Sequence, residues 1–255
     1  MHIPRIYLNQ EISINTEITL PKETALHITT VLKKRSGQNI IIFNNKPDLN
    51  NSNQYGEYLA EILTASKNNL TIKIIQYNIK NTQSRIILEL AQCISKPQHF
   101  DVTLQKSVEL GVNIITPIIS ERSEQSYVAQ KLDQKYSRWE RIIISACEQS
   151  GRTDLPVLNQ PIILTDWVKK LQINNNLLIT LCTKTNKKLS NLKINQTELH
   201  KITALIGPEG GLSDVEINLL NNNNFNLISL GNRILRTETA GIAIMAILQY
   251  VMGNL

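Results

Sequence analysis

Short apolar runs separated by polar residues fill the first third of the chain, and the pattern changes near residue 85. Runs of this length, bounded by turn residues, are typical of β-strands. They predict strands at 6–8, 17–20, 40–43, 57–63 and 70–75. Between the second and third runs, apolar residues recur at helical spacing over 22–34. Many short strands with one small helix indicate a compact β-barrel.

From residue 85 onward, apolar runs of strand length alternate with segments of helical period. The expected strands are 86–91, 114–119, 177–181, 202–206 and 226–230, and the expected helices are 100–110, 131–150, 213–220 and 237–251. This alternation is typical of an α/β fold, in which helices cover both faces of a mostly parallel sheet. We therefore expect two domains, residues 1–74 and 75–255, with the polar stretch 78–84 as the linker.

Composition narrows the class of protein without naming a function. The net charge of +6 favours a polyanionic partner without requiring one. Cys93, Cys147 and Cys182 lie far apart and form no CxxC pair, so we expect neither a disulfide framework nor a metal site. The chain opens without an apolar signal segment, and no run approaches the roughly 18 apolar residues of a membrane helix. These features predict a cytoplasmic protein with no membrane segment.

A glycine-rich turn at 207–211 follows one predicted strand and precedes a predicted helix. Ser213 and Glu216 have the spacing of a capping box, which marks the start of that helix. Such turns bind phosphate in other folds. However, no Lys-Ser/Thr pair follows the glycines and GxGxxG is absent, so a nucleoside triphosphate or NAD is disfavoured. A purely structural turn remains the alternative.

A second glycine turn follows the next predicted strand. Leu230 and Gly231 end that strand, and Arg233 and Arg236 then flank two apolar residues. Two arginines beside a glycine turn can hold the phosphates of a polynucleotide or can brace a loop. The two turns have the layout of a ligand site at the strand ends of an α/β sheet.

Together these motifs resemble the SPOUT superfamily of RNA methyltransferases, and more narrowly the RsmE family of 16S ribosomal RNA (uracil-N3) methyltransferases. The resemblance rests on GPEGGLS at 207–213, LGNRILRTETA at 230–240, ACEQSGR at 146–152 and QKSVELGV at 105–112. It extends to the N-terminal stretch RIY at 5–7 and to 27–37. The chain departs from many relatives at Lys33-Lys34-Arg35 and in several asparagine-rich loops.

The resemblance implies a PUA-like RNA-binding β-barrel over residues 1–74. It also implies a SPOUT methyltransferase domain over 75–255 with a C-terminal trefoil knot, S-adenosylmethionine as cofactor, 16S rRNA or the small ribosomal subunit as partner, and a homodimer. One sequence feature agrees with a dimer. The predicted helix 237–251 is apolar almost all round, as expected of a helix buried in a core or at a subunit interface.

In the family that this chain resembles, three loops form the cofactor pocket. The corresponding residues here are Leu181, Cys182, Thr183, Ile206, Gly207, Glu209, Gly211, Leu230, Gly231, Ile234, Leu235, Thr239 and Ala240. Their apolar side chains suit an adenine ring, and their glycines let the backbone come close to a ligand. The residues that we expect to contact RNA are Arg5, Lys33, Lys34, Arg35 and Lys106.

Methylation at N3 of uridine requires removal of the N3 proton, or stabilisation of the anion that is left. Arg152 and Arg236 are the candidates for holding anionic uracil oxygens or neighbouring phosphates, and Glu148 and Glu238 are the candidate bases. The residues alone leave alternatives open, because Glu148 can serve as a structural hydrogen-bond acceptor and Glu238 can interact with a helix dipole.

Two other functions compete with this one. The chain can be another SPOUT RNA methyltransferase that acts on a ribose 2′-hydroxyl. It can also be a non-catalytic rRNA-binding assembly protein that keeps the fold. The intact glycine turns and the arginines argue against loss of catalysis. The sequence does not single out the base.

Overall fold

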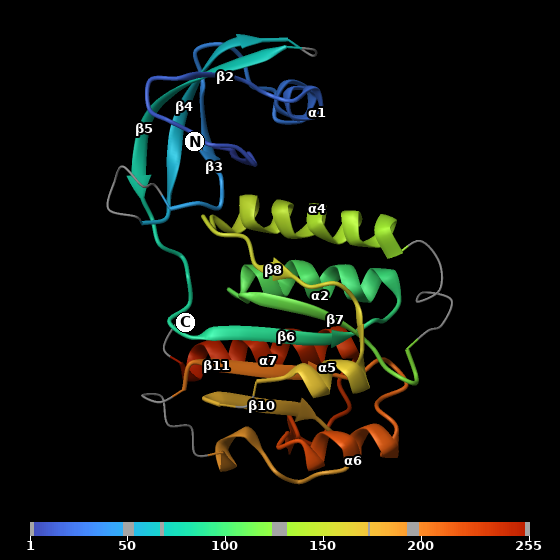
Figure 1. Cartoon of the computed structure of the whole chain (residues 1–255). Helices are drawn as coiled ribbons and strands as arrows, with labels where there is room; N and C mark the ends of the chain where they lie inside the picture. The colour runs from blue at the N-terminus through green and yellow to red at the C-terminus, as the bar shows by residue number, and fades with distance from the viewer. Residues whose placement is uncertain are drawn as a thin grey trace. The chain divides into compact units, whose positions relative to one another are not determined.

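The computed structural model separates into two compact units (Figure 1). The first unit comprises residues 1–82 together with 147–155, and the second comprises 83–146 together with 156–255. The structure describes residues 3–47, 54–66, 69–123, 132–172, 174–192 and 199–252.

The first unit is built on a five-stranded sheet with the strand order β1-β3-β4-β5-β2. Its strands are β1 (Arg5–Tyr7), β2 (Glu17–Thr19), β3 (Asn39–Phe43), β4 (Gly56–Ala65) and β5 (Leu70–Ile79). β1 runs parallel to β3, and the other neighbours are antiparallel. Alternate residues, such as Ile40 and Ile42 in β3, are fully buried in one apolar core. The five strands predicted from the sequence are confirmed.

Two details of this unit differ from the prediction. The helix expected over 22–34 is α1 (Lys22–Leu26) followed by a π-helical turn, η1 (His27–Val31), and it ends before Lys33, whose φ is 53°. β5 continues to Ile79, so the boundary expected after residue 74 and the start of the expected linker both fall within a strand. The end of β5 is mostly exposed and polar, which is why its sequence resembles a linker.

The second unit contains a seven-stranded sheet in which every pair is parallel. The strand order is β12-β10-β11-β6-β7-β8, and β9 also pairs with β7. The strands are β6 (Ile87–Cys93), β7 (Ile114–Ile119), β8 (Val157–Leu158), β9 (Ile162–Ile163), β10 (Asn176–Leu181), β11 (Lys201–Ile206) and β12 (Asn226–Ile228). The predicted parallel α/β fold is confirmed. The sequence pattern missed β8 and β9, because a two-residue strand has no period to detect.

Five α-helices of the described residues accompany this sheet. They are α2 (Pro97–Glu109), α4 (Leu132–Ser150), α5 (Leu164–Lys170), α6 (Asp214–Asn222) and α7 (Thr237–Val251). A short 3-10 turn, η2 (Leu189–Asn191), follows β10. The seven-residue α5 was not predicted. The last residues of α4, from Cys147, belong to the first unit.

Helices cover both faces of the parallel sheet, as residues of β6 demonstrate. Successive residues of a strand point to opposite faces. Ala91 and Cys93 lie in the apolar cluster that also contains Trp167 of α5. Gln92, between them, donates a hydrogen bond to Thr237 of α7. α5 and α7 therefore lie on opposite faces, and Figure 1 shows α7 beside β6 and β11.

The final helix buries one face and leaves another partly exposed. Gly241, Ile244, Met245 and Leu248 are buried where α7 packs against the sheet and α2. Ile247 on the same helix is exposed in the single chain. The prediction that α7 is buried in a core is therefore confirmed for one face, and burial of the other face at a subunit interface stays a prediction. Within the part of the chain that the structure describes, no helix combines the length and the apolar character needed to cross a membrane.

Candidate functional site

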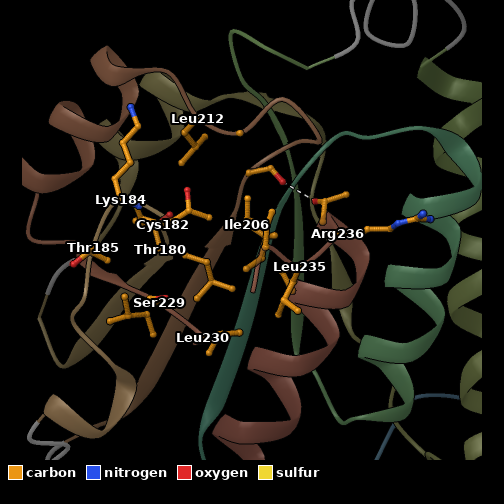
Figure 2. A pocket seen from close by; sticks show the side chains of 18 of the residues that line it. Thr180, Cys182, Lys184, Thr185, Ile206, Leu212, Ser229, Leu230, Leu235 and Arg236 are labelled. Carbon is orange, nitrogen blue, oxygen red and sulfur yellow. Dashed lines mark hydrogen bonds between the residues drawn. The ribbon is translucent and has the colours of Figure 1, made fainter. Parts of the chain in front are cut away.

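A cavity of about 1050 Å³ opens at the carboxyl ends of β10, β11 and β12 (Figure 2). The carboxyl ends of parallel strands meet at one edge of a sheet, so loops far apart in sequence come together there. Every residue predicted to bind the cofactor lines this cavity except Thr239. The second unit supplies the entire lining.

The glycine turn after β11 has a backbone conformation that depends on glycine. Gly211 has a φ of +68°, and its N–H donates to the Pro208 carbonyl oxygen at 2.9 Å. A side chain at that φ is strained, whereas glycine adopts it freely. The Ser213–Glu216 capping box is confirmed: Ser213 N donates to Glu216 Oε2 at 2.8 Å, and Glu216 N donates to Ser213 Oγ at 3.3 Å. The turn and the start of α6 are therefore fixed locally.

Hydrogen bonds also connect the glycine turn to α7. Thr237 Oγ1 donates to the Gly207 carbonyl oxygen at 2.6 Å, and Gln92 Nε2 donates to Thr237 Oγ1 at 2.9 Å. One hydroxyl thus connects β6, the turn after β11 and the first residue of α7. The cavity wall here is positioned by buried hydrogen bonds.

Apolar side chains line the middle of the cavity. Figure 2 shows Ile206 and Leu235 side by side, with Leu230 and Thr180 nearby. Cys182 is half-buried, and its Sγ accepts a hydrogen bond from the Lys184 amide at 3.4 Å. Ile234, by contrast, is 86% exposed at the rim, although it was predicted to help bind adenine. Its role in cofactor binding stays a prediction.

Another wall of the cavity carries ionisable side chains. His99 Nδ1 lies 3.2 Å from Glu209 Oε1 and 3.7 Å from Glu238 Oε2. Glu209 Oε1 also accepts a hydrogen bond from the Lys96 amide at 3.0 Å. Burial opposes ionisation of Glu209, but the hydrogen bonds from the Lys96 and Glu209 amides and from His99 outweigh it, so its pKa is lowered. His99 could not be singled out from the sequence, because its partners are 110 and 139 residues away.

Two of the four predicted catalytic residues line the cavity. Glu238 is in the first turn of α7, and its side chain is 15% exposed. Arg236 is exposed at the helix N-cap, and Figure 2 shows its guanidinium directed away from Thr180 and Cys182. In the described residues no group of three potential ligands is arranged to hold a metal ion.

The other two predicted catalytic residues belong to the first unit and do not line this cavity. Arg152 is 4% exposed and its Nη2 contacts Asp154 Oδ2 at 2.6 Å. Glu148 Oε1 accepts a hydrogen bond from the Tyr7 amide at 3.0 Å. Burial raises the pKa of Glu148, against the smaller opposing effects of the Tyr7 hydrogen bond and nearby cations. Both side chains have structural partners that the sequence did not reveal, and their catalytic roles stay predictions.

The residues predicted to contact RNA differ in exposure. Lys33 and Arg35 are exposed, and Lys34 is half-buried. Lys106 Nζ forms an ion pair with Glu109 Oε1 at 2.8 Å. Arg5 is buried, and its guanidinium forms an ion pair with Glu57 and donates to the Arg152 carbonyl oxygen. The exposed basic side chains that remain for RNA in this set are Lys33 and Arg35.

The parallel α/β fold with a cavity at its strand ends defines a ligand-binding domain, and a family model identifies its class. The model described as RNA methyltransferase domain matches residues 82–249. Ribosomal RNA small subunit methyltransferase E of Buchnera aphidicola from Schizaphis graminum is 37% identical over 99% of this chain and 98% of the relative. The enzyme of the same name from Rickettsia conorii is 31% identical over 96% of this chain and 95% of the relative. The chain therefore belongs to the ribosomal RNA small subunit methyltransferase E family.

Solved structures agree over the full length. Ribosomal RNA small subunit methyltransferase E from Neisseria gonorrhoeae, bound to S-adenosyl methionine, matches with a TM-score of 0.87 and 32% identity over 98% of both chains. A putative methyltransferase from Legionella pneumophila, in complex with the bound cofactor SAM, matches with the same TM-score, identity and coverage.

Proposed function

We propose that this chain transfers a methyl group from S-adenosylmethionine to N3 of a uridine in 16S ribosomal RNA. The observation that supports this most strongly is the meeting of three predicted cofactor loops around one cavity, in a chain that has two full-length structural relatives solved with that cofactor. The site of methylation follows from the family resemblance, and the chemistry of the cavity is compatible with it.

The cavity fits S-adenosylmethionine. Pockets for small molecules usually enclose about 300–1,000 Å³, so a cavity of about 1050 Å³ accommodates the cofactor and part of a target nucleotide. A Cβ added at Gly211 or Gly231 would meet no protein atom within 4 Å, which leaves open space beside the backbone for a ligand. Ile206, Leu230 and Leu235 offer an apolar slot for adenine. When bound, the cofactor supplies an electrophilic methyl group on its sulfonium.

The remaining task of the protein is to activate N3. This nitrogen is a poor nucleophile until its proton is removed. Glu238 lies in the cavity wall and can take part in that removal, and Arg236 at the rim can stabilise a uracil oxygen or a phosphate. Arg152 and Glu148 remain proposed catalytic residues, supported only by the resemblance of their motif.

We also propose the finer organisation that the resemblance implies. The first part of the chain, predicted as residues 1–74, forms a PUA-like RNA-binding barrel, and the rest, predicted as residues 75–255, forms a SPOUT domain with a C-terminal trefoil knot. The exposed Lys33 and Arg35 support contact of the first part with RNA. The partly exposed face of α7, which carries Ile247, supports a homodimer. The protein acts in the cytoplasm, where small ribosomal subunits are found.

The test is methylation in vitro with purified protein and methyl-labelled S-adenosylmethionine. Naked 16S rRNA and assembled small subunits are offered separately, and the nucleosides are identified by mass spectrometry. We expect 3-methyluridine. A 2′-O-methylated nucleoside would support the alternative SPOUT activity. Tight rRNA binding without methylation of either substrate would support a non-catalytic assembly protein.

A further inference from the structure

N3 methylation needs a proton acceptor beside the target base, and the cavity offers few. Most of its charged side chains are lysines and arginines, which are protonated at neutral pH. Its carboxylates and its imidazole, on Glu209, Glu238 and His99, form one cluster on a single wall. These three side chains come from different elements: the turn after β11, α7 and α2, respectively. The acceptor can be sought within this cluster.

Glu209 is the least suited of the three. Its Oε1 accepts hydrogen bonds from the Lys96 amide and from His99, at the N-terminal end of α2. A carboxylate at a helix N-terminus is stabilised in its charged form. These contacts attach the glycine turn to α2. Removing them to take up a proton would release the turn, so Glu209 acts as an anchor.

Glu238 faces the same ring from the other side. Its Oε2 is buried and has no hydrogen-bond partner among the described residues, although it lies 3.7 Å from His99 Nδ1. A buried carboxylate oxygen without a partner is costly and calls for an explanation. It is placed to pair with His99 when that ring becomes positively charged.

The two carboxylates also set the tautomer of His99. Both approach the Nδ1 edge of the ring, so the neutral imidazole carries its hydrogen on Nδ1 and donates it to Glu209. Nε2 then bears the lone pair, and the ring lines the cavity with 30% of its side chain exposed. A carboxylate that holds Nδ1–H and leaves Nε2 free to accept a proton is the arrangement of a histidine general base.

We propose that His99 is the general base of the methyl transfer, held between Glu209 and Glu238. Nε2 accepts the N3 proton, and the electron pair of the broken N–H bond stays on N3. That pair forms the new N–CH₃ bond as the C–S bond breaks and its electrons return to sulfur, which becomes a neutral thioether. The imidazolium is stabilised by the two carboxylates and releases its proton to solvent. This inference rests on the proposed function, and it makes Glu238 a positioning residue.

The main test replaces His99 by Gln, which retains a polar side chain but cannot accept a proton. We expect kcat for methylation to fall by about 10²–10⁴-fold, the usual contribution of a general base. The affinity for S-adenosylmethionine, measured by calorimetry, should stay close to that of the wild type. His99→Ala should regain part of its activity when imidazole is added. Glu238→Gln should lower kcat less than His99→Gln does.

A second measurement does not depend on turnover. Nitrogen-15 NMR of the imidazole in the full chain without ligands should show His99 as the Nδ1–H tautomer when the ring is neutral. Glu209→Gln should weaken that preference, because an amide can either donate to or accept from the ring. His200→Gln is the matched control. His200 lies in the same unit, is exposed, and hydrogen bonds only through its backbone in the described structure. We expect that variant to behave like the wild type.

Three results would overturn the proposal. They are near-normal kcat in His99→Gln, a loss confined to cofactor affinity, and an Nε2–H tautomer in the wild type. The second result would show a structural clamp between α2 and the glycine turn. Failure of the proposed function is seen separately, because the wild type would then bind the cofactor without producing 3-methyluridine, whereas the NMR result is readable in either case.

Discussion

Gly211→Ala tests directly whether the turn after β11 contacts the cofactor. Gly211 has a φ of +68°, and an added Cβ would meet no protein atom within 4 Å. The substitution therefore causes no clash within the protein, and its intrinsic cost is backbone strain of about 1–2 kcal/mol. The methyl group would extend into the cavity that Gly211 lines. Gly37 is a matched control, because its φ is +80° and a Cβ there also meets nothing within 4 Å.

We expect both variants to lose about 1–2 kcal/mol of unfolding free energy in a urea titration. Only Gly211→Ala should lose affinity for S-adenosylmethionine in calorimetry. Overpacking of a well-filled site costs about 1–3 kcal/mol, which corresponds to roughly 5- to 150-fold in dissociation constant. Unchanged affinity in Gly211→Ala would remove the turn from the ligand contact. An equal loss in Gly37→Ala would assign the effect to reduced stability.

Three further predictions concern buried charges. Lys201→Gln should lower the unfolding free energy by up to roughly 3–5 kcal/mol in urea, because it leaves the Glu89 carboxylate, 3% exposed, without its cation. The pKa of Glu148 is raised above its ordinary value of 4.5 by burial, so the stability of the wild type relative to Glu148→Gln should be greatest below that pH and should fall as the pH rises through the folded pKa. Arg152→Ala should destabilise by roughly 3–5 kcal/mol because it strands a buried carboxylate, whereas Arg236→Ala, at an exposed site, should change stability by less than about 0.5 kcal/mol. Equal thermal shifts for the two arginine variants would contradict this.

Local signals explain why much of the second unit could be predicted. The turn 207–211 joins a buried strand to a helix that begins with Ser213 and Glu216, and each of these signals lies within a few residues of the next. The meeting of the loops then follows from a general property of parallel sheets, whose strands end at one edge. For this reason the predicted cofactor residues gather in space although they span sixty positions of sequence from Leu181 to Ala240.

Features that depend on distant or very short elements could not be predicted in the same way. β8 and β9 are two residues each and leave no periodic pattern. The partners of His99 lie in other elements, so its contacts with them could not be predicted from the order of residues along the chain. Arg152 is the opposite case. Its partner, Asp154, is only two residues away, yet the spacing of the two residues does not by itself indicate an ion pair.

Thr237 belongs to one of the motifs, but its contacts give it a structural role. Its hydroxyl accepts from Gln92 and donates to the Gly207 carbonyl oxygen, so it fixes the distance between β6, α7 and the glycine turn. Gly241, one turn later, keeps α7 close to β6, because a Cβ there would lie 3.0 Å from Gln92 Oε1. Loss of activity at either position would therefore report a shifted cavity wall. His99 differs, because its Nε2 is engaged by no described residue while its other edge is held by carboxylates. A group of that kind can change its protonation during the reaction without moving the loops that bind the cofactor.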